Sequence, residues 1–121
     1  MTWGMWVAAG MALLGIGASG EASAQGPKPF SGVASYYGKN YSGRTAHGER
    51  YDGQNLTAAH RSLPFGTHLR VTARATKRSV LVVINDRGPF TKGRVLDLSF
   101  AAAQALHMTD RGLINVTAAV E

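Results

Sequence analysis

Apolar and polar residues alternate with a period of two along several short segments of the chain, and this period predicts β-strands. The alternation is clearest in His68–Ala73, where Leu69 and Val71 lie between polar or charged residues. The continuous apolar run Val80–Ile84 predicts instead a strand buried on both faces. The six expected strands are Ser31–Tyr37, Leu56–Ala59, His68–Ala73, Ser79–Asn85, Val95–Leu98 and Leu113–Val120.

One helix is expected among these strands. Ser99 is suited to cap it, and the alanine-rich segment Phe100–His107 follows directly. Six short strands and one short helix favour a mainly β fold, a small β-barrel, over a layered α/β fold. The glycine-rich stretch between residues 38 and 55 predicts a long loop, and loops of this length are usually functional or disordered.

The N-terminal segment Met1–Ala24 predicts a secretory signal, because an apolar stretch precedes the small-residue tripeptide Ala22-Ser23-Ala24. The segment contains no Lys or Arg, so an uncleaved membrane anchor is the alternative. Gln25–Phe30 is interpreted as a linker, and residues 31–121 as one small domain. We therefore expect a soluble periplasmic or secreted protein with no stable membrane insertion after cleavage.

The formal net charge is +6 and cysteine is absent. Disulfides, thiolate metal sites and cysteine nucleophiles are thereby excluded. The positive charge favours polyanionic surroundings such as the cell wall or outer-membrane lipid. Nucleic acid is not expected as a partner, because the basic residues are scattered and no aromatic residues are interleaved with them to stack on bases.

Asp86 is the strongest candidate for chemistry. It follows the apolar strand directly, and Arg87-Gly88-Pro89 then turns the backbone away from the sheet. A carboxylate at such a rim is partly desolvated, which suits it to hold a proton near neutral pH. The alternative is an Asp that only caps the turn before Gly88.

Other side chains are weaker candidates. The four histidines have no metal-chelating spacing, so no metal or other cofactor is expected. His60 follows a buried-looking segment, Leu56–Ala59, in the same strand-end context as Asp86, and Asp97 is expected to satisfy backbone donors before the helix. Aromatic faces stack on sugar rings, so tyrosines beside carboxylates suggest a carbohydrate groove, although they could equally pack the barrel end. These are Tyr36, Tyr37, Tyr41 and Tyr51.

Six ordered motifs closely resemble the rare lipoprotein A family. They are Gly32-Val-Ala-Ser-Tyr-Tyr-Gly38, Thr45-Ala-His-Gly-Glu-Arg-Tyr-Asp52, Leu56-Thr-Ala-Ala-His60, Leu63-Pro-Phe-Gly-Thr67, Asn85-Asp-Arg-Gly-Pro-Phe90 and Gly93-Arg-Val-Leu-Asp-Leu-Ser99. The resemblance implies a six-stranded double-psi β-barrel. It also implies an endolytic lytic transglycosylase, a carbon–oxygen lyase that cleaves peptide-free peptidoglycan strands to 1,6-anhydro-muramic ends.

The resemblance assigns Asp86 as the catalytic acid/base and implies that His60 and Glu49 orient Asp86 and the sugar. We expect a monomer whose partner is the glycan strand. The expected substrate contacts are Tyr36, Tyr37, Arg44, Tyr51, Asp52 and Arg87. The family's lipidated cysteine and its domain for denuded glycan are not found in this sequence, and the segment Gly43–Ala46 is one residue shorter than usual. Targeting is therefore expected to be weak or supplied by a partner.

Two other functions remain open at the level of sequence. One is a non-catalytic, expansin-like barrel that binds cell-wall polysaccharide. The other is an inverting hydrolase, which requires a second carboxylate roughly 6.5–9.5 Å from Asp86 to activate water. Glu49, Asp52 or Asp97 could supply that carboxylate.

Overall fold

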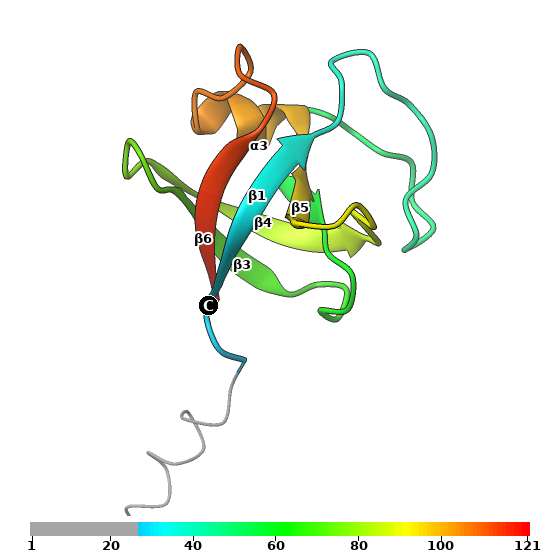
Figure 1. Ribbon diagram of the computed structural model, residues 1–121. Coiled ribbons are helices and arrows are strands. Elements are labelled where there is room, and N and C mark those ends of the chain that lie inside the picture. The colour runs from blue at the N-terminus through cyan, green and yellow to red at the C-terminus, as the bar shows by residue number, and fades with distance from the viewer. Residues whose placement is uncertain (1–26) are drawn as a thin grey trace, which may run out of the picture.

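A computed structural model describes residues 27–121, so the expected signal segment and the start of the linker lie outside the described residues. Six strands close into a barrel in the order β1-β5-β2-β4-β3-β6, with one short helix (Figure 1). The mainly β barrel expected from the pattern is confirmed. The elements are β1 (Phe30–Tyr36), β2 (Thr57–Ala59), β3 (His68–Ala73), β4 (Ser79–Asp86), β5 (Arg94–Leu98), α3 (Phe100–Ala105) and β6 (Ile114–Val120).

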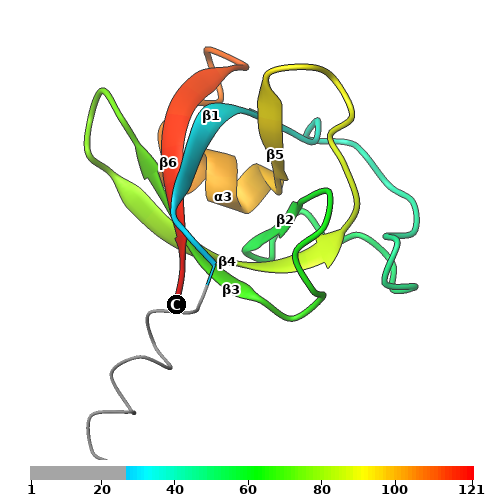
Figure 2. The ribbon, with the colours of Figure 1, turned by 60° about the horizontal axis from the view of Figure 1, so that its bottom comes forward.

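Two parallel strand pairs lie within this otherwise antiparallel barrel. β1 pairs with β5 and β2 pairs with β4 in parallel, while the remaining neighbours are antiparallel. In Figure 2 the strands surround the barrel interior, and α3 lies across one end of it. Parallel pairing brings the C-terminal ends of β2 and β4 to the same rim, which positions the candidate site described below.

The core is formed by one face of each strand. Leu69, Val82, Ile84 and Leu96 are fully buried in the barrel interior. The expectation that Val80–Ile84 is buried on both faces is wrong, because Leu81 and Val83 alternate with the buried residues and are only half-buried. A small barrel has one filled interior, so the outward face of β4 is left partly in contact with solvent.

Ser99 caps α3 as expected: its Oγ accepts from the Ala102 amide at 3.2 Å. The helix ends at Ala105 rather than at His107, because Leu106 is the C-cap and His107 has the left-handed φ of 56°. Leu56 also departs from expectation, since it is 43% exposed just before β2 begins. Within residues 27–121, no helix has the length and apolar character needed to span a bilayer.

Candidate functional site at the barrel rim

Asp86 and His60 lie at the same rim because β2 and β4 run in parallel. Ala59, the last residue of β2, pairs with Asp86, the last residue of β4. The backbone amide of His60 then donates to the Asp86 carbonyl oxygen at 3.2 Å. Gly88 follows at a φ of 121°, a conformation that favours glycine and turns the chain away from the barrel.

The Asp86 carboxylate is held by three hydrogen-bond donors. Oδ1 accepts from the amides of Ala46 at 2.7 Å and Arg87 at 2.9 Å, and Oδ2 accepts from the phenolic O–H of Tyr37. The Arg87 bond is local, as a turn-capping Asp would make. The bonds from Tyr37 and Ala46 are not local, so the carboxylate also ties the long loop and the end of β1 to the rim.

Three tyrosines form a cluster beside Asp86. Tyr37 stacks on Tyr51 with ring centroids 4.7 Å apart, and Tyr41 packs edge-on against both rings. Burial raises the pKa of Tyr37 well above its ordinary value, and the hydrogen bond and charge of Asp86 raise it further. Burial also raises the pKa of Tyr51, whose hydroxyl accepts from the Phe100 amide. Both phenols therefore stay neutral at physiological pH.

The imidazole of His60 has a fixed tautomer. Its Nδ1 accepts from the amides of Ser62 at 3.1 Å and Leu63 at 3.0 Å, so the neutral ring carries its proton on Nε2. Burial lowers the pKa of His60, and the positive charges of Arg87 and Arg61 lower it further. At neutral pH the ring is therefore uncharged and presents a single N–H donor, on Nε2.

Glu49 lies in a polar group beside the end of β4. It faces His47 Nδ1 at 3.1 Å and accepts from Asn85 Nδ2 at 3.4 Å, and the His47 amide donates to the Asn85 carbonyl oxygen. His47 also packs edge-on against Phe65, and the Arg87 guanidinium lies 4.0 Å from the Phe65 ring centroid. Sequence reasoning did not select His47, although its spacing of two from Glu49 was a usable signal.

Three of the expected substrate contacts form hydrogen bonds away from Asp86. Tyr36 points away from its neighbour Tyr37: its hydroxyl donates to the Thr109 carbonyl oxygen at 2.6 Å. Arg44 donates to the carbonyl oxygen of Gly48 within its own loop, and Asp52 accepts from the amide of Gln54. None of the three has a side-chain hydrogen bond to Asp86 among the described residues. Of the other three, Tyr37 and the Arg87 amide donate to Asp86, and Tyr51 stacks on Tyr37.

Asp97 is a second carboxylate near the rim site. It accepts from the hydroxyl of Ser35 and pairs with Arg94 at 3.5 Å. A methyl group built on Gly88 would lie 3.9 Å from Asp97 Oδ2, and the charge of Asp97 contributes to the raised pKa of Tyr37. We expected Asp97 to accept from backbone donors before the helix, but its partners are side chains. The backbone of β5 is already paired with β1 and β2 within the barrel.

The fold and its rim site define a double-psi β-barrel protein. The papain inhibitor of Streptomyces superposes with a TM-score of 0.63 at 23% identity, over 77% of this chain and 94% of that chain. Apo expansin of Clavibacter michiganensis superposes with a TM-score of 0.62 at 24% identity, over 78% of this chain and 50% of that chain. At this level of identity the likeness shows the fold alone.

The chain belongs to the lytic transglycolase family, whose model matches residues 30–118. The probable endolytic peptidoglycan transglycosylase RlpA of Nostoc is 57% identical over 72% of this chain and 24% of that protein. The endolytic peptidoglycan transglycosylase RlpA of Vibrio cholerae is 46% identical over 74% of this chain and 35% of that protein. The family expected from the motifs is thus confirmed, and the chain spans about a quarter to a third of these relatives' length.

Proposed function

We propose that this domain is an endolytic peptidoglycan lytic transglycosylase acting outside the cytoplasm, with Asp86 as its acid/base. The observation that carries the proposal is the position of Asp86: a carboxylate at an open rim, held by three donors and bordered by tyrosines. The names of the relatives, which are 46% and 57% identical, support the same reaction and substrate.

The hydrogen bonds of Asp86 favour Oδ2 as the oxygen that carries the catalytic proton in this proposal. Oδ1 faces two amide donors, neither of which can accept a proton, so the acid form holds its proton on Oδ2 beside Tyr37. This proton passes to the glycosidic oxygen as the bond to the anomeric carbon breaks. Asp86, now a carboxylate, removes the proton of the C6 hydroxyl, whose oxygen closes the 1,6-anhydro ring. Asp86 is thereby reprotonated for the next cycle.

His60 and Glu49 act as positioning groups in this proposal. The neutral His60 ring offers Nε2–H to a sugar oxygen while its Nδ1 is anchored to the backbone. Glu49 holds His47 and Asn85, the residue before Asp86 in the chain. Replacing either His60 or Glu49 with Ala should weaken cleavage without unfolding the barrel, since neither side chain belongs to the core.

Exposed aromatic rings supply stacking surfaces for the sugars. Tyr41 is 46% exposed and Phe90 is 78% exposed, and an apolar ring left in water at this rim is suited to stack on a sugar face. Phe90 was not selected from the sequence. We further propose that peptide-free strands are preferred, because removing a stem peptide leaves a carboxylate directly beside the muramic ring, where it can approach a domain of net charge +6.

The second candidate is an inverting hydrolase, which the position of Asp97 near Gly88 favours. In that reaction Asp97 would activate water while Asp86 protonates the leaving oxygen. The Asp97 carboxylate already accepts from Ser35 and pairs with Arg94, so one of these interactions would have to break before Asp97 could act as a base. A barrel that only binds polysaccharide is the third possibility, and it requires no proton donor at the rim.

One digestion distinguishes the three possibilities. The purified protein is incubated with peptide-free glycan strands, and the products are weighed by mass spectrometry. We expect fragments of several disaccharides with 1,6-anhydro ends. Reducing ends heavier by one water would indicate the hydrolase, and Asp97→Asn should then abolish them. Strands that are retained by the protein but never cleaved would indicate the binding barrel.

A further inference from the structure

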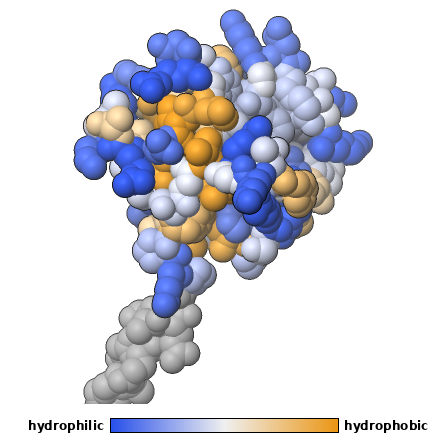
Figure 3. Space-filling view, viewed as in Figure 1, coloured by the Kyte–Doolittle hydropathy of each residue, from blue (hydrophilic) through white to orange (hydrophobic). Residues whose placement is uncertain are grey.

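A cleft of about 610 Å³ lies away from the rim site, between the β3–β4 turn and the segment that joins α3 to β6. Leu113 and Ile114 contribute apolar surface to it: Leu113 is 51% exposed and Ile114 is half-buried, whereas Leu106 belongs to the buried core beneath them. Figure 3 shows an apolar area bordered by hydrophilic side chains beside this turn. The volume is within the range of about 300–1,000 Å³ that is usual for ligand-binding clefts.

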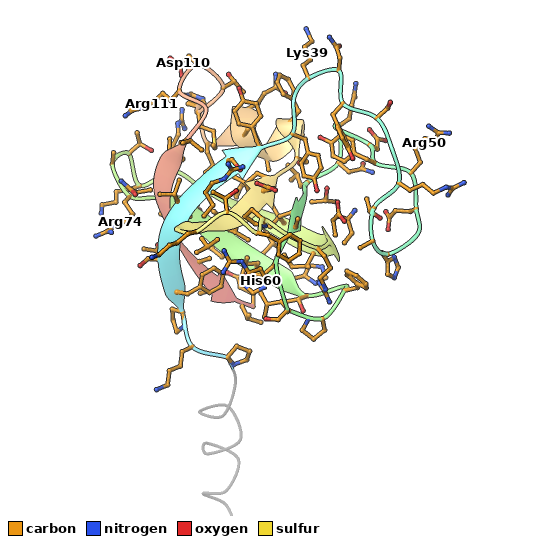
Figure 4. The ribbon with its side chains drawn as sticks, turned by 45° about the vertical axis from the view of Figure 1, so that its right-hand side comes forward. Lys39, Arg50, His60, Arg74, Asp110 and Arg111 are labelled. Atoms are coloured by element: carbon orange, nitrogen blue, oxygen red, sulfur yellow. The ribbon has the colours of Figure 1, made fainter. Side chains whose placement is uncertain are left out.

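The charged residues that line this cleft are all cationic. Arg74 and Lys77 line it from the turn and Arg111 from the opposite segment, and no Asp or Glu lines it. Within residues 27–121, none of these three cations forms a salt bridge. Figure 4 shows Arg74 and Arg111 on the same side of the barrel, with Arg50 on the opposite side. The cleft is therefore complementary to an anion, and the reaction proposed for Asp86 does not use it.

Two residues of the cleft hold an unusual backbone conformation. Lys77 has a φ of 68° and His107 a φ of 56°, the two positive values at non-glycine positions in the described chain. Glycine adopts this region with less strain than any residue with a Cβ. Lys77 and His107 thus present polar side chains beside the cleft at two positions where glycine would adopt the backbone conformation with less strain.

We propose that this cleft binds an acidic peptide segment of a partner protein, with an apolar side chain of the segment seated against Leu113 and Ile114. The combination of apolar surface and unpaired cations requires a ligand that is both anionic and apolar. A bilayer surface fits less well, because interfacial binding needs a broad apolar face that enters the lipid, and Leu113 is the one large apolar side chain of this cleft that is exposed. A linear segment can insert a side chain into a cleft while its carboxylates meet the cations around it.

The test is a titration of the full-length, ¹⁵N-labelled protein with an acetylated pentapeptide of alternating Glu and Leu, followed by NMR. We expect chemical-shift changes at Thr76, Leu113 and Ile114. Arg74→Glu and Arg111→Glu should each weaken binding at least tenfold, and Leu113→Ser should weaken it several-fold. Leu113 is exposed, so that change spares the core. Arg50→Glu is the matched control for net charge and should leave binding unchanged.

Each other outcome would overturn the proposal. No binding, or equal weakening by Arg50→Glu, would reduce the cleft to a nonspecific cationic surface. Equal binding of a Glu-Ser pentapeptide would exclude a role for the apolar surface. Phosphatidylglycerol vesicles that bind through Arg74 and Arg111, while the Glu-Leu peptide does not bind, would assign the cleft to lipid.

Discussion

The hydroxyl of Tyr37 donates to Oδ2 of Asp86, although the two residues are 49 positions apart. This contact joins the residue after β1 to the last residue of β4. It also places a neutral phenol on the carboxylate oxygen that we assign as the proton carrier. Tyr36, the preceding residue, sends its hydroxyl in another direction, to the Thr109 carbonyl oxygen. Substitution of Tyr37 therefore tests the contact with Asp86, and the same substitution of Tyr36 is its control.

Tyr37→Phe should lower the rate of strand cleavage at least tenfold, because the carboxyl group of Asp86 loses the partner that orients Oδ2. Tyr36→Phe also removes one phenolic hydrogen bond and should leave the rate unchanged. Each variant should lose about 1 kcal/mol of unfolding free energy, the usual value of one hydrogen bond. Cleavage assays and urea denaturation measure the two effects separately. Equal losses of activity in both variants would show that Tyr37 acts only through stability.

Asp86→Asn should abolish cleavage while the protein remains folded. The amide oxygen can still accept from Ala46 and Arg87, and its NH₂ group can donate to Tyr37, whose hydroxyl then accepts. The amide cannot supply the proton. Asp110→Asn, in an exposed turn, is the control for loss of one charge. If Asp86 only caps its turn, Asp86→Asn would keep that cap and stay active.

His60 should make the folded protein less stable at acidic pH. Its pKa is lowered in the folded state, so below pH 6.5 the unfolded chain binds the proton more readily, and unfolding free energy falls as pH decreases. Thermal denaturation between pH 7.5 and 5 should show this slope. His60→Asn should reduce it, because the Asn oxygen can accept the two backbone N–H bonds without titrating.

The strands and the helix of the barrel could be predicted from the sequence because short-range patterns of residues specify them. Alternation predicts the strands, and Ser99 marks the start of α3. The rim position of Asp86 also followed from local pattern, since an apolar run ends there and a turn begins. The partners of Asp86 could not be predicted this way. Ala46 and Tyr37 reach it through loop closure and barrel topology, and adjacent tyrosines have the same local propensity whichever way their hydroxyls point.

Arg61 holds the loop that carries Phe90. Replacing Arg61 should therefore loosen this loop more than it loosens the barrel core. Its guanidinium donates to the carbonyl oxygens of Pro89 at 2.6 Å, Thr91 at 3.0 Å and Arg94 at 3.2 Å. A single ammonium cannot reproduce this fork of donors, so Arg61→Lys should be nearly as harmful as Arg61→Ala.

Because hydrogen bonds to a charged group contribute about 1.5–3 kcal/mol, we expect Arg61→Ala to lose a comparable amount of unfolding free energy. Faster exchange of the Arg94 amide, which donates to the Thr91 carbonyl oxygen across this loop, should accompany this loss, while exchange at the core strand β4 should change only with global stability. Arg78→Ala removes an exposed Arg whose side chain has no hydrogen bond among the described residues, and it should change neither quantity. Unchanged exchange of the Arg94 amide in Arg61→Ala would show that the loop is held by its own turn. In that case Phe90 would keep its place at the rim without the guanidinium.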